Sequence, residues 1–259
     1  MKFWVEVASL GVVFWLERIF PLFQERKNRI RHALPNLGIG VLNGLVISFC
    51  FSAVTLKVIQ YGEGHSWGLL RQIHWGSLTE SILAFVLFDF WMYVWHRANH
   101  GIPFLWRFHR MHHSDLELDS TSALRFHTGE IILSSLLRLI VVPLIGMQFI
   151  HLLIYEICLQ PIIIFHHSNV ALPEKIDRIL RAMIVTPNMH RIHHSQVRNE
   201  TDSNYSSIFS FWDRSVFSFR KREDTRTLVY GLPYLQEPKW QSLWGMIKTP
   251  FVNISRIRR

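Results

Sequence analysis

Long apolar segments alternate with short polar ones along this chain and predict a bundle of membrane helices. The apolar segments cover residues 1–21, 37–59, 78–95 and 131–165. Segment 37–59, at ~1.5 Å per helical residue, is long enough to cross a hydrocarbon core of ~30 Å. Segment 78–95 predicts a further spanning helix and ends directly at a pair of histidines. We therefore expect an all-α protein embedded in a membrane.

The first segment is either a cleaved signal peptide or a retained anchor helix. Glu6 and Glu17 interrupt its apolar character, and no cleavage site of small residues follows it. A secretory signal peptide has an uninterrupted apolar region and such a site. We expect residues 1–21 to remain as an anchor helix that begins outside the cytoplasm and crosses the membrane.

The last apolar segment, 131–165, can form one long helix or two shorter helices folded as a hairpin. Pro143 and Gly146 interrupt it near its middle, and proline disfavours a continuous helix. His127 precedes the segment, and a pair of histidines follows it. If these histidines belong to one site, the chain enters and leaves the membrane by the same face. This condition favours the hairpin.

The composition fits one membrane domain. With 49% hydrophobic and 18% charged residues, the chain is too apolar for an ordinary soluble domain. Its two cysteines both lie inside apolar runs and form no CxxC pair, so a disulfide framework or a thiolate metal site is not expected. No linker or repeat divides the chain. We expect a single domain, 1–259, with an anchor region 1–77, a catalytic core at about 78–219 and a basic tail 220–259.

The positive charge orients the helices. The net charge is +9, and basic residues cluster from Arg220 onward and between the first two apolar segments, at Arg26, Lys27, Arg29 and Arg31. Basic loops stay in the cytoplasm, so we expect histidine-rich cytoplasmic helices that cap the membrane helices, with residues 61–76 on the opposite side. No nucleic-acid-binding motif accompanies the charge, and anionic lipid headgroups are the simpler partner. The expected location is the bacterial inner membrane or the endoplasmic reticulum.

Three polar segments carry histidines at helical spacing. The near-identical hexapeptides HRMHHS (109–114) and HRIHHS (190–195) each place histidines at positions i, i+3 and i+4, and HRANH (96–100) places them at i and i+4. Such positions share one face of a helix. Each segment can therefore aim its imidazoles at one point, whereas the isolated histidines predict a structural role: His32, His65, His74 and His151.

The number of histidines predicts two metal ions. Eight imidazoles in three segments exceed the four ligands of one tetrahedral zinc ion, and no Cys, Asp or Glu is interleaved with them. Imidazole suits zinc, copper, iron and nickel, so the ligand type does not name the metal. Oxidation of aliphatic C–H bonds needs activated O₂, which favours iron, with zinc as the alternative occupant in the isolated protein.

Two polar residues precede the first histidine pair on the same helical stripe. Asp89, Tyr93, His96 and His100 follow steps of four, three and four residues. We expect Asp89 to accept a hydrogen bond from an imidazole N–H and so to orient it. Tyr93 is a second candidate catalytic residue on this stripe. Further along the chain, residues 203–217 are expected to cap the site.

These motifs closely resemble the fatty acid hydroxylase superfamily, also called the sterol desaturase family, of integral membrane di-iron oxygenases. The resemblance runs from about Phe88 to Phe219 and rests on DFWMYVWHRANH, LWRFHRMHHS, RFHTGE, HHSNV, TPNMHRIHHS and ETDSNYSSIFSFWDRSVF. It implies that ten histidines hold two iron ions: His96, His100, His109, His112, His113, His127, His167, His190, His193 and His194.

Two members of this set depend on short elements of the resemblance. His127 is included because HTGE is similar to the family's His-Pro-x-Glu element, although Thr128 replaces the proline. His167 is preferred to His166, the runner-up, because it immediately precedes Ser168 and Asn169.

The resemblance implies an O₂-dependent oxidation of a fatty acyl, sterol-like or other long-chain lipid. Hydroxylation is the first expectation, and desaturation by the same centre is the alternative. The chain has no flavin, haem or dinucleotide motif, so electrons would come from a separate reductase with a ferredoxin or a cytochrome b5-like protein. A non-catalytic zinc-binding protein or transporter is a further alternative, but transport predicts ligands near the bilayer midplane, whereas these histidines flank the helices at one face.

Overall fold

The computed structural model describes residues 1–24, 28–72 and 76–253, and within these ranges it consists of helices and loops without a β-strand. Arg26, Lys27 and His74 lie outside the described residues. The long helices are α1 (Lys2–Ile19), α2 (Arg29–Val46), α3 (Ser52–Gly64), α4 (Ser77–Gly101), α6 (Thr128–Ile145) and α7 (Phe149–His167). The shorter ones are α5 (Pro103–His113), α8 (Glu174–Leu180), α9 (Pro187–His193), α10 (Arg198–Thr201), α11 (Phe211–Ser215) and α12 (Leu243–Lys248). Single turns complete the set: η1 (Ile47–Phe51), η2 (Leu69–Arg71), η3 (Ser120–Leu124), η4 (Thr225–Thr227), η5 (Pro238–Gln241) and η6 (Thr249–Phe251).

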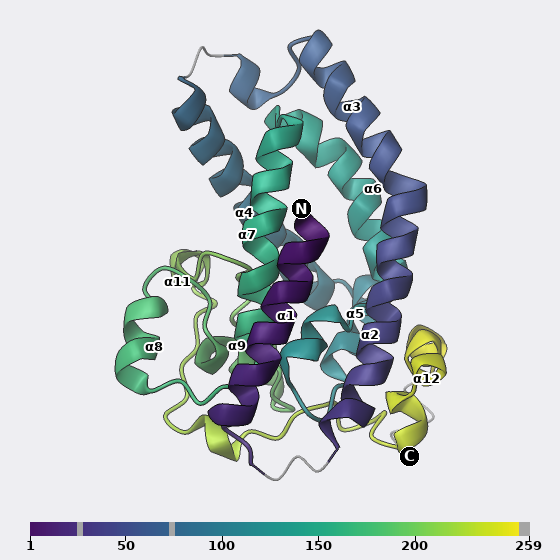
Figure 1. Cartoon of the computed structure of the whole chain (residues 1–259), viewed down its shortest axis with the longest axis vertical. Coiled ribbons are helices and arrows are strands. Elements are labelled where there is room, and N and C mark those ends of the chain that lie inside the picture. Colours follow the sequence, from purple (N-terminus) through teal and green to yellow (C-terminus); the bar gives the residue numbers. More distant parts are fainter. Residues whose placement is uncertain (25–27, 73–75, 254–259) are drawn as a thin grey trace.

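Among the described residues, four segments are long and apolar enough to cross a membrane, which makes the chain an integral membrane protein. These segments are Arg29–Arg71, Ser77–Gly101, Thr128–Ile145 and Phe149–His167. In the first of them, α2 and α3 continue one another through the π-helical turn η1. Figure 1 shows this long helix beside α6, with the shorter helices gathered at the opposite end from the α6–α7 turn. The expected all-α membrane bundle is confirmed.

The segment 131–165 forms the hairpin that the sequence favoured. α6 ends at Gly146, which adopts the left-handed conformation (φ 86°) that a helix C-terminus commonly needs and glycine tolerates. Gly68, in the connection between α3 and α4, packs on this turn so closely that a Cβ atom there would lie 2.3 Å from the Cα of Gly146. Both connections therefore lie at one end of the bundle, and α5 and α9, which carry the two histidine repeats, lie toward the other (Figure 1).

Helix α1 differs from the expected spanning anchor. It is not among the four candidate spans, and its charged residues explain why an apolar window of sufficient length is missing. Lys2 forms an ion pair with Glu156 at 2.7 Å, so α1 begins beside the middle of α7 instead of at its far end. At its other end, Glu17 accepts a hydrogen bond from the backbone N–H of Asn169 at 2.8 Å. α1 thus runs along the C-terminal half of α7, toward the histidines with which α7 ends.

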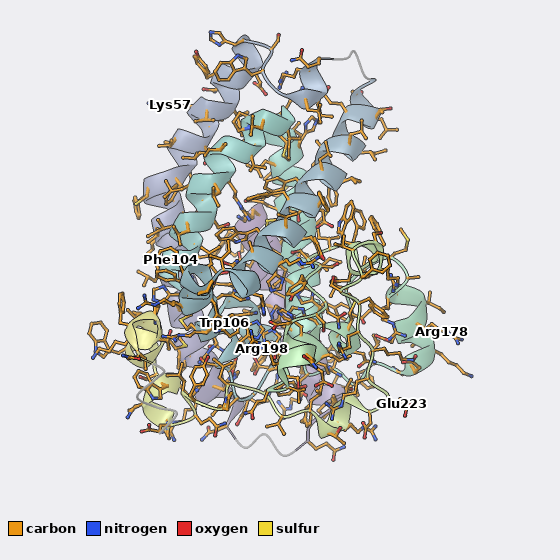
Figure 2. All side chains as sticks on the ribbon, turned by 180° about the vertical axis from the view of Figure 1, so that it is seen from behind. Lys57, Phe104, Trp106, Arg178, Arg198 and Glu223 are labelled. Carbon is orange, nitrogen blue, oxygen red and sulfur yellow. The ribbon has the colours of Figure 1, made fainter. Side chains whose placement is uncertain are left out.

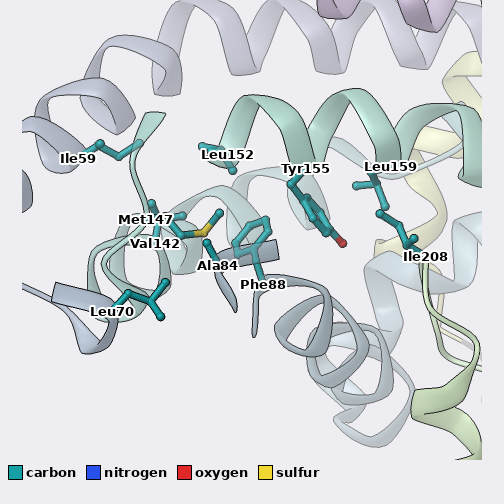
Figure 3. Packing of buried hydrophobic residues seen from close by; sticks show 10 residues of the cluster. All are labelled: Ile59, Leu70, Ala84, Phe88, Val142, Met147, Leu152, Tyr155, Leu159 and Ile208. Atoms are coloured by element: carbon teal, nitrogen blue, oxygen red, sulfur yellow. The ribbon is translucent and has the colours of Figure 1, made fainter. Parts of the chain in front are cut away.

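The membrane helices are held together by an apolar core. Buried side chains from α3, α4, α6 and α7 meet around Phe88 and Tyr155, whose rings pack edge to face with centroids 4.8 Å apart (Figure 3). Ile208, from the segment after α9, joins the same cluster. The core therefore connects the membrane helices to the chain segment that covers the histidines.

Candidate metal centre

The two repeated hexapeptides lie at the ends of two short helices. α5 has Pro103 and α9 has Pro187 in the first turn, where the missing N–H of proline breaks no hydrogen bond. In α5 the three histidines lie in the C-terminal part of the helix, which ends at His113, whereas in α9 His194 directly follows the last helical residue, His193. All six are buried, so each repeat delivers three imidazoles to the interior.

Nine imidazoles gather in two groups, within each of which one nitrogen of every ring lies within 4.8 Å of the others. The first group is His96, His100, His109, His113 and His193; the second is His112, His167, His190 and His194. Neighbouring positions on a helix point about 100° apart around its axis. His112 and His113 accordingly belong to different groups, as do His193 and His194, so each repeat contributes to both.

In the first group, four of the five rings each have one nitrogen at hydrogen-bonding distance from a protein oxygen atom. The Nδ1 atoms lie at hydrogen-bonding distance from Tyr205 O (His96, 2.8 Å), Asp202 Oδ1 (His100, 3.4 Å), Glu130 Oε1 (His109, 2.9 Å) and Ser203 O (His193, 2.7 Å). With the proton on Nδ1, the lone pair remains on Nε2. These four Nε2 atoms are buried without a hydrogen-bond partner among the described residues. Converging acceptors of this kind fit a metal ion.

In the second group, the Nε2 atoms themselves are close together. Nε2 of His167 lies 3.1 Å from that of His112 and 3.0 Å from that of His190. The Nε2 atoms of His190 and His194 are 3.1 Å apart. Imidazole nitrogens ~2.0–2.1 Å from one metal ion lie roughly 3 Å apart when their bonds to it are at right angles. The spacing of these four rings fits ligands around one ion.

Burial keeps the imidazoles in the neutral form. It lowers the pKa of His193 to about 3. Burial, followed by the neighbouring imidazoles, also lowers the pKa well below its ordinary value for His112, His113, His190 and His194. Because a histidine must be neutral to bind a metal ion, the environment favours the ligand form of these side chains.

Two of the predicted or alternative histidines lie outside both groups. His127 caps α6: its Nδ1 accepts a hydrogen bond from Gly129 N–H at 2.9 Å, and its Nε2 lies 3.0 Å from the carbonyl oxygen of Ile247. With both nitrogens bonded to the backbone, this ring has no free lone pair for a metal ion. His166 packs its ring centroid 4.1 Å from that of His190, but it is not a member of either group.

Asp89 does not orient an imidazole, in contrast to the expectation from its helical stripe. Its carboxylate accepts hydrogen bonds from Tyr155 Oη at 2.8 Å, Trp212 Nε1 at 2.9 Å and Phe209 N at 3.0 Å. The physical reason is distance along the helix. Asp89 precedes His96 by seven residues, roughly 10 Å of helical rise, which exceeds the reach of a carboxylate.

Tyr93 also contacts the chain that follows α10, residues 203–218, which we call the covering segment, and it lies outside both histidine groups. Its Oη lies 2.8 Å from Ser218 Oγ and accepts a hydrogen bond from Arg97 at 3.1 Å. Tyr93 and Asp89 therefore both hold the chain after α10 against α4.

The covering segment in turn orients the first histidine of the site. Asp213 accepts hydrogen bonds from the backbone N–H groups of Tyr205 at 2.8 Å and Ser206 at 2.9 Å. This fixes the peptide whose carbonyl, on Tyr205, holds Nδ1 of His96. Asp213 thus orients His96 indirectly, through the Tyr205–Ser206 peptide.

Glu130 and Asp202 are the orienting carboxylates that sequence reasoning missed. Glu130 is buried and faces His109, although 21 positions separate them in the chain. The available signal was an acidic residue three positions after His127 in HTGE. The spacing does not reveal that the chain between α5 and α6 returns this residue to His109.

The chain is similar to known lipid hydroxylases. Residues 81–217 match the family model described as fatty acid hydroxylase. An alkylglycerol monooxygenase of Homo sapiens is 27% identical over 86% of this chain and 47% of its own length. An ornithine lipid hydroxylase, OlsE, of Rhizobium tropici is 28% identical over 83% of this chain and 66% of its own. A cholesterol 25-hydroxylase of Rattus norvegicus is 21% identical over 60% of this chain and 51% of its own.

The chain thus spans about half of the length of the human alkylglycerol monooxygenase that it matches. No solved structure matches it.

Proposed function

Because the chain belongs to the fatty acid hydroxylase family, we propose that it is a membrane-bound oxygenase that hydroxylates a C–H bond of a lipid. The observation that carries this proposal is the pair of histidine groups, which together offer nine imidazoles to two metal ions, all of them buried except the half-buried His96 and His100. Relatives named as monooxygenases or hydroxylases of lipids support hydroxylation ahead of desaturation.

The proposed cofactor is a pair of iron ions. His96, His100, His109, His113 and His193 would hold one ion, and His112, His167, His190 and His194 the other. Imidazole ligands suit iron, and two iron ions held side by side would supply the activation of O₂ that oxidation of an aliphatic C–H bond requires. The chain contributes neutral ligands, and the oxygen atoms bonded to Nδ1 keep four rings of the first ion from rotating.

The proposed substrate is a long-chain lipid that reaches the site from the bilayer. The histidines of α4 and α7 lie at the ends of candidate membrane spans, where an acyl chain in one leaflet is near. Relatives named for alkylglycerol, ornithine lipid and cholesterol share a lipid as their named compound. We propose that the site faces the cytoplasm and that a separate reductase with a ferredoxin or a cytochrome b5-like protein delivers the electrons.

The proposal is tested by two measurements on the purified protein in lipid nanodiscs. Metal analysis should find two ions per chain after iron is supplied, and O₂ uptake with a reductase and ferredoxin should depend on added lipid and yield a hydroxylated product. His65→Ala is the matched control, because His65 lies after α3 at the far end of the bundle and should leave both results unchanged. Two bound metals without lipid-dependent O₂ uptake would favour a non-catalytic metal-binding protein, and an alkene product would favour a desaturase.

A further inference from the structure

The helix α12 and the start of α5 form an exposed flank, and we propose that this flank lies in the interface of a membrane that contains anionic phospholipids. We call it the interfacial flank. It consists of three large apolar residues, Phe104 (55% exposed), Trp244 (65%) and Phe251 (74%), and of the exposed cations Arg107 and Lys248. This proposal does not depend on the reaction that the histidines support.

Hydrogen bonds place the two parts of the interfacial flank side by side. Arg107 Nε donates to the carbonyl oxygen of Pro250 at 3.1 Å. Arg110 donates to the carbonyl oxygen of Val252 at 2.9 Å and to that of Thr249. Figure 2 shows Phe104 and α12 on the same flank of the molecule. The flank is therefore one surface, although its parts are more than 130 residues apart in the chain.

The flank lies at the depth of a membrane interface. α12 packs on α2 at Gly38, where an added Cβ would lie 3.3 Å from Cδ2 of Leu243. At the other end of this span, the rings of Tyr61 and Trp67 pack edge to face with centroids 5.4 Å apart, as is typical of an aromatic belt. A core of ~30 Å takes about 20 helical residues. Counting about 20 residues from Tyr61 toward the N-terminus of α2 places the other edge of the hydrocarbon core near residue 41, close to Gly38.

A second contact supports the same depth. His127, the N-cap of the membrane helix α6, lies at hydrogen-bonding distance from the carbonyl oxygen of Ile247 in α12. The candidate span of α6 therefore begins beside α12, and the span of α2 and α3 passes α12 at Gly38. A short helix in this position contacts the headgroup region instead of bulk water or the hydrocarbon centre.

The chemistry of the interfacial flank fits anionic lipid headgroups. Tryptophan favours the membrane–water interface, and the Nζ of Lys248 lies 5.0 Å from the ring centroid of Trp244, so a cation and an aromatic ring are offered together. Glu237, the nearby acidic residue of this segment, is paired with Lys239 at 2.7 Å. Arg107 and Lys248 therefore leave a positive surface, which attracts phosphate groups of negatively charged lipids.

Contact with the membrane would fix the depth of a helix that carries ligand histidines. Arg110 lies between His109 and His112 in the sequence, and it is buried with its guanidinium bonded to the end of the α12 segment. A membrane contact at Trp244 is thus connected to α5 through hydrogen bonds from the Arg110 side chain to backbone carbonyls that follow α12. The flank is an anchor for the helix of the first hexapeptide repeat.

Spin-label accessibility of the full chain in nanodiscs tests the depth. In a Cys50→Ser, Cys158→Ser background, a nitroxide is attached after Trp244→Cys or, as matched control, after Val229→Cys. Val229 is 62% exposed, close to the 65% of Trp244, but it lies in the loop that bonds to Gln196 away from the membrane helices. The label at position 244 should collide several-fold more with O₂, relative to a water-soluble nickel chelate, than the label at 229. Equal nickel accessibility at both positions would overturn the proposal and indicate a surface for a soluble protein.

A charge variant tests the lipid class. Phosphatidylglycerol added to phosphatidylcholine nanodiscs should move the label at 244 deeper, and Lys248→Glu should abolish this shift. An identical shift in Lys248→Glu would overturn the role of the cation. Circular dichroism checks that each variant keeps the helical content of the parent, so the test is independent of metal content and activity.

Discussion

His109 and His127 differ in what binds their ring nitrogens, although both lie in motifs that resemble one family. His109 has its Nδ1 held by Glu130, and its Nε2 is buried without a partner among the described residues. Both nitrogens of His127 are engaged by backbone groups of Gly129 and Ile247. A nitrogen that retains its lone pair can bind a metal ion, whereas one that is already bonded cannot without breaking that contact.

The first prediction compares these two types of histidine. His127→Asn should leave two metal ions bound, because asparagine is a good helix N-cap and the residue lies outside both groups. His113→Asn should lose one ion, because His113 belongs to the first group. Metal analysis of both purified variants decides the point. Loss of an ion in His127→Asn would restore His127 to the ligand set.

The second prediction concerns the carboxylate behind His109. Glu130→Ala should weaken metal binding by roughly 10–100-fold, as removal of a group that orients a ligand typically does. Glu130→Gln retains a carbonyl oxygen that can accept from Nδ1–H and should lose less. Competition with a chelator measures both affinities. Equal losses in the two variants would indicate that Glu130 acts through its charge and not through orientation.

The third prediction is a loss of stability in acid for the metal-free protein. His193 stays neutral in the fold down to a pKa of about 3, because it is buried, whereas the unfolded chain protonates it near 6.5. Between these values the unfolded state binds more protons, so the free energy of unfolding falls as the pH falls, by up to about 1.4 kcal/mol per pH unit for each such histidine.

The window from pH 6.5 to 5 separates this effect from ordinary carboxylates, which titrate below it. Thermal unfolding of the chelator-treated protein should shift to lower temperature across this window, and the shift should be smaller in His193→Asn. A midpoint that stays constant from pH 6.5 to 5 would contradict the neutral, buried state of these imidazoles.

Much of the arrangement of the histidines could be predicted from the sequence, because helical periodicity depends only on residues that are close in the chain. The spacing within each repeat indicates which histidines share a face, and the 100° step explains why His112 and His113 diverge. The partners of the other ring nitrogens are not local. Tyr205 and Ser203 contribute backbone carbonyls, which have no sequence signature, and Glu130 reaches His109 only through the fold.

At the scale of elements, residues on one stripe of α4 contact two different parts of the molecule, the histidine site and the covering segment. The C-terminal end of α4 carries His96 and His100. Asp89, about two turns earlier in the same helix, accepts a hydrogen bond from Trp212. The stripe was visible in the sequence, but its direction was misread, because the partner of Asp89 comes from more than 100 residues later. The α6–α7 hairpin was predictable, since Pro143 and Gly146 mark its turn locally.

The fourth prediction follows from this double role of α4. Asp89→Ala leaves buried donors of Tyr155, Phe209 and Trp212 without their acceptor, and each unpaired buried donor costs about 1–3 kcal/mol. We expect a loss of roughly 3 kcal/mol or more in the free energy of unfolding and a lower thermal midpoint in detergent.

Glu80→Ala is its control on the same helix, because Glu80 accepts one long hydrogen bond from Gln148 at 3.4 Å. It should change the midpoint little. An Asp89→Ala variant as stable as Glu80→Ala would show that the covering segment is held by its apolar contacts alone.

At the scale of the whole molecule, the candidate spans place the histidines and the turns at opposite ends. The turn at Gly146 meets Gly68, and the histidines of α4 and α7 lie at the other ends of those helices. The expected anchor crossing of α1 is replaced by a helix that lies along half of α7. The charged residues of α1 already exclude it from the candidate spans by composition, whereas the ion pair of Lys2 with Glu156 forms only in the folded bundle.

The fifth prediction is the topology. Reporter fusions at Gly68 and after Val252 should give opposite signals, because the α3–α4 connection and the α12 segment lie at different ends of the long span. The basic residues favour a cytoplasmic signal after Val252. The same signal from both fusions would contradict a crossing by α2 and α3.

The dispersed origin of the histidine groups has a consequence for biosynthesis. His96 and His100 leave the ribosome long before Tyr205, whose carbonyl holds His96, and before His193, which joins them in one group. At about 5–20 residues per second, the roughly 100 residues between His100 and Tyr205 take about 5–20 s to translate. During this interval the early imidazoles have neither their orienting oxygens nor their later neighbours. Insertion of α4 into the bilayer and completion of the histidine groups are therefore separate events in time, because both groups contain histidines of the second repeat.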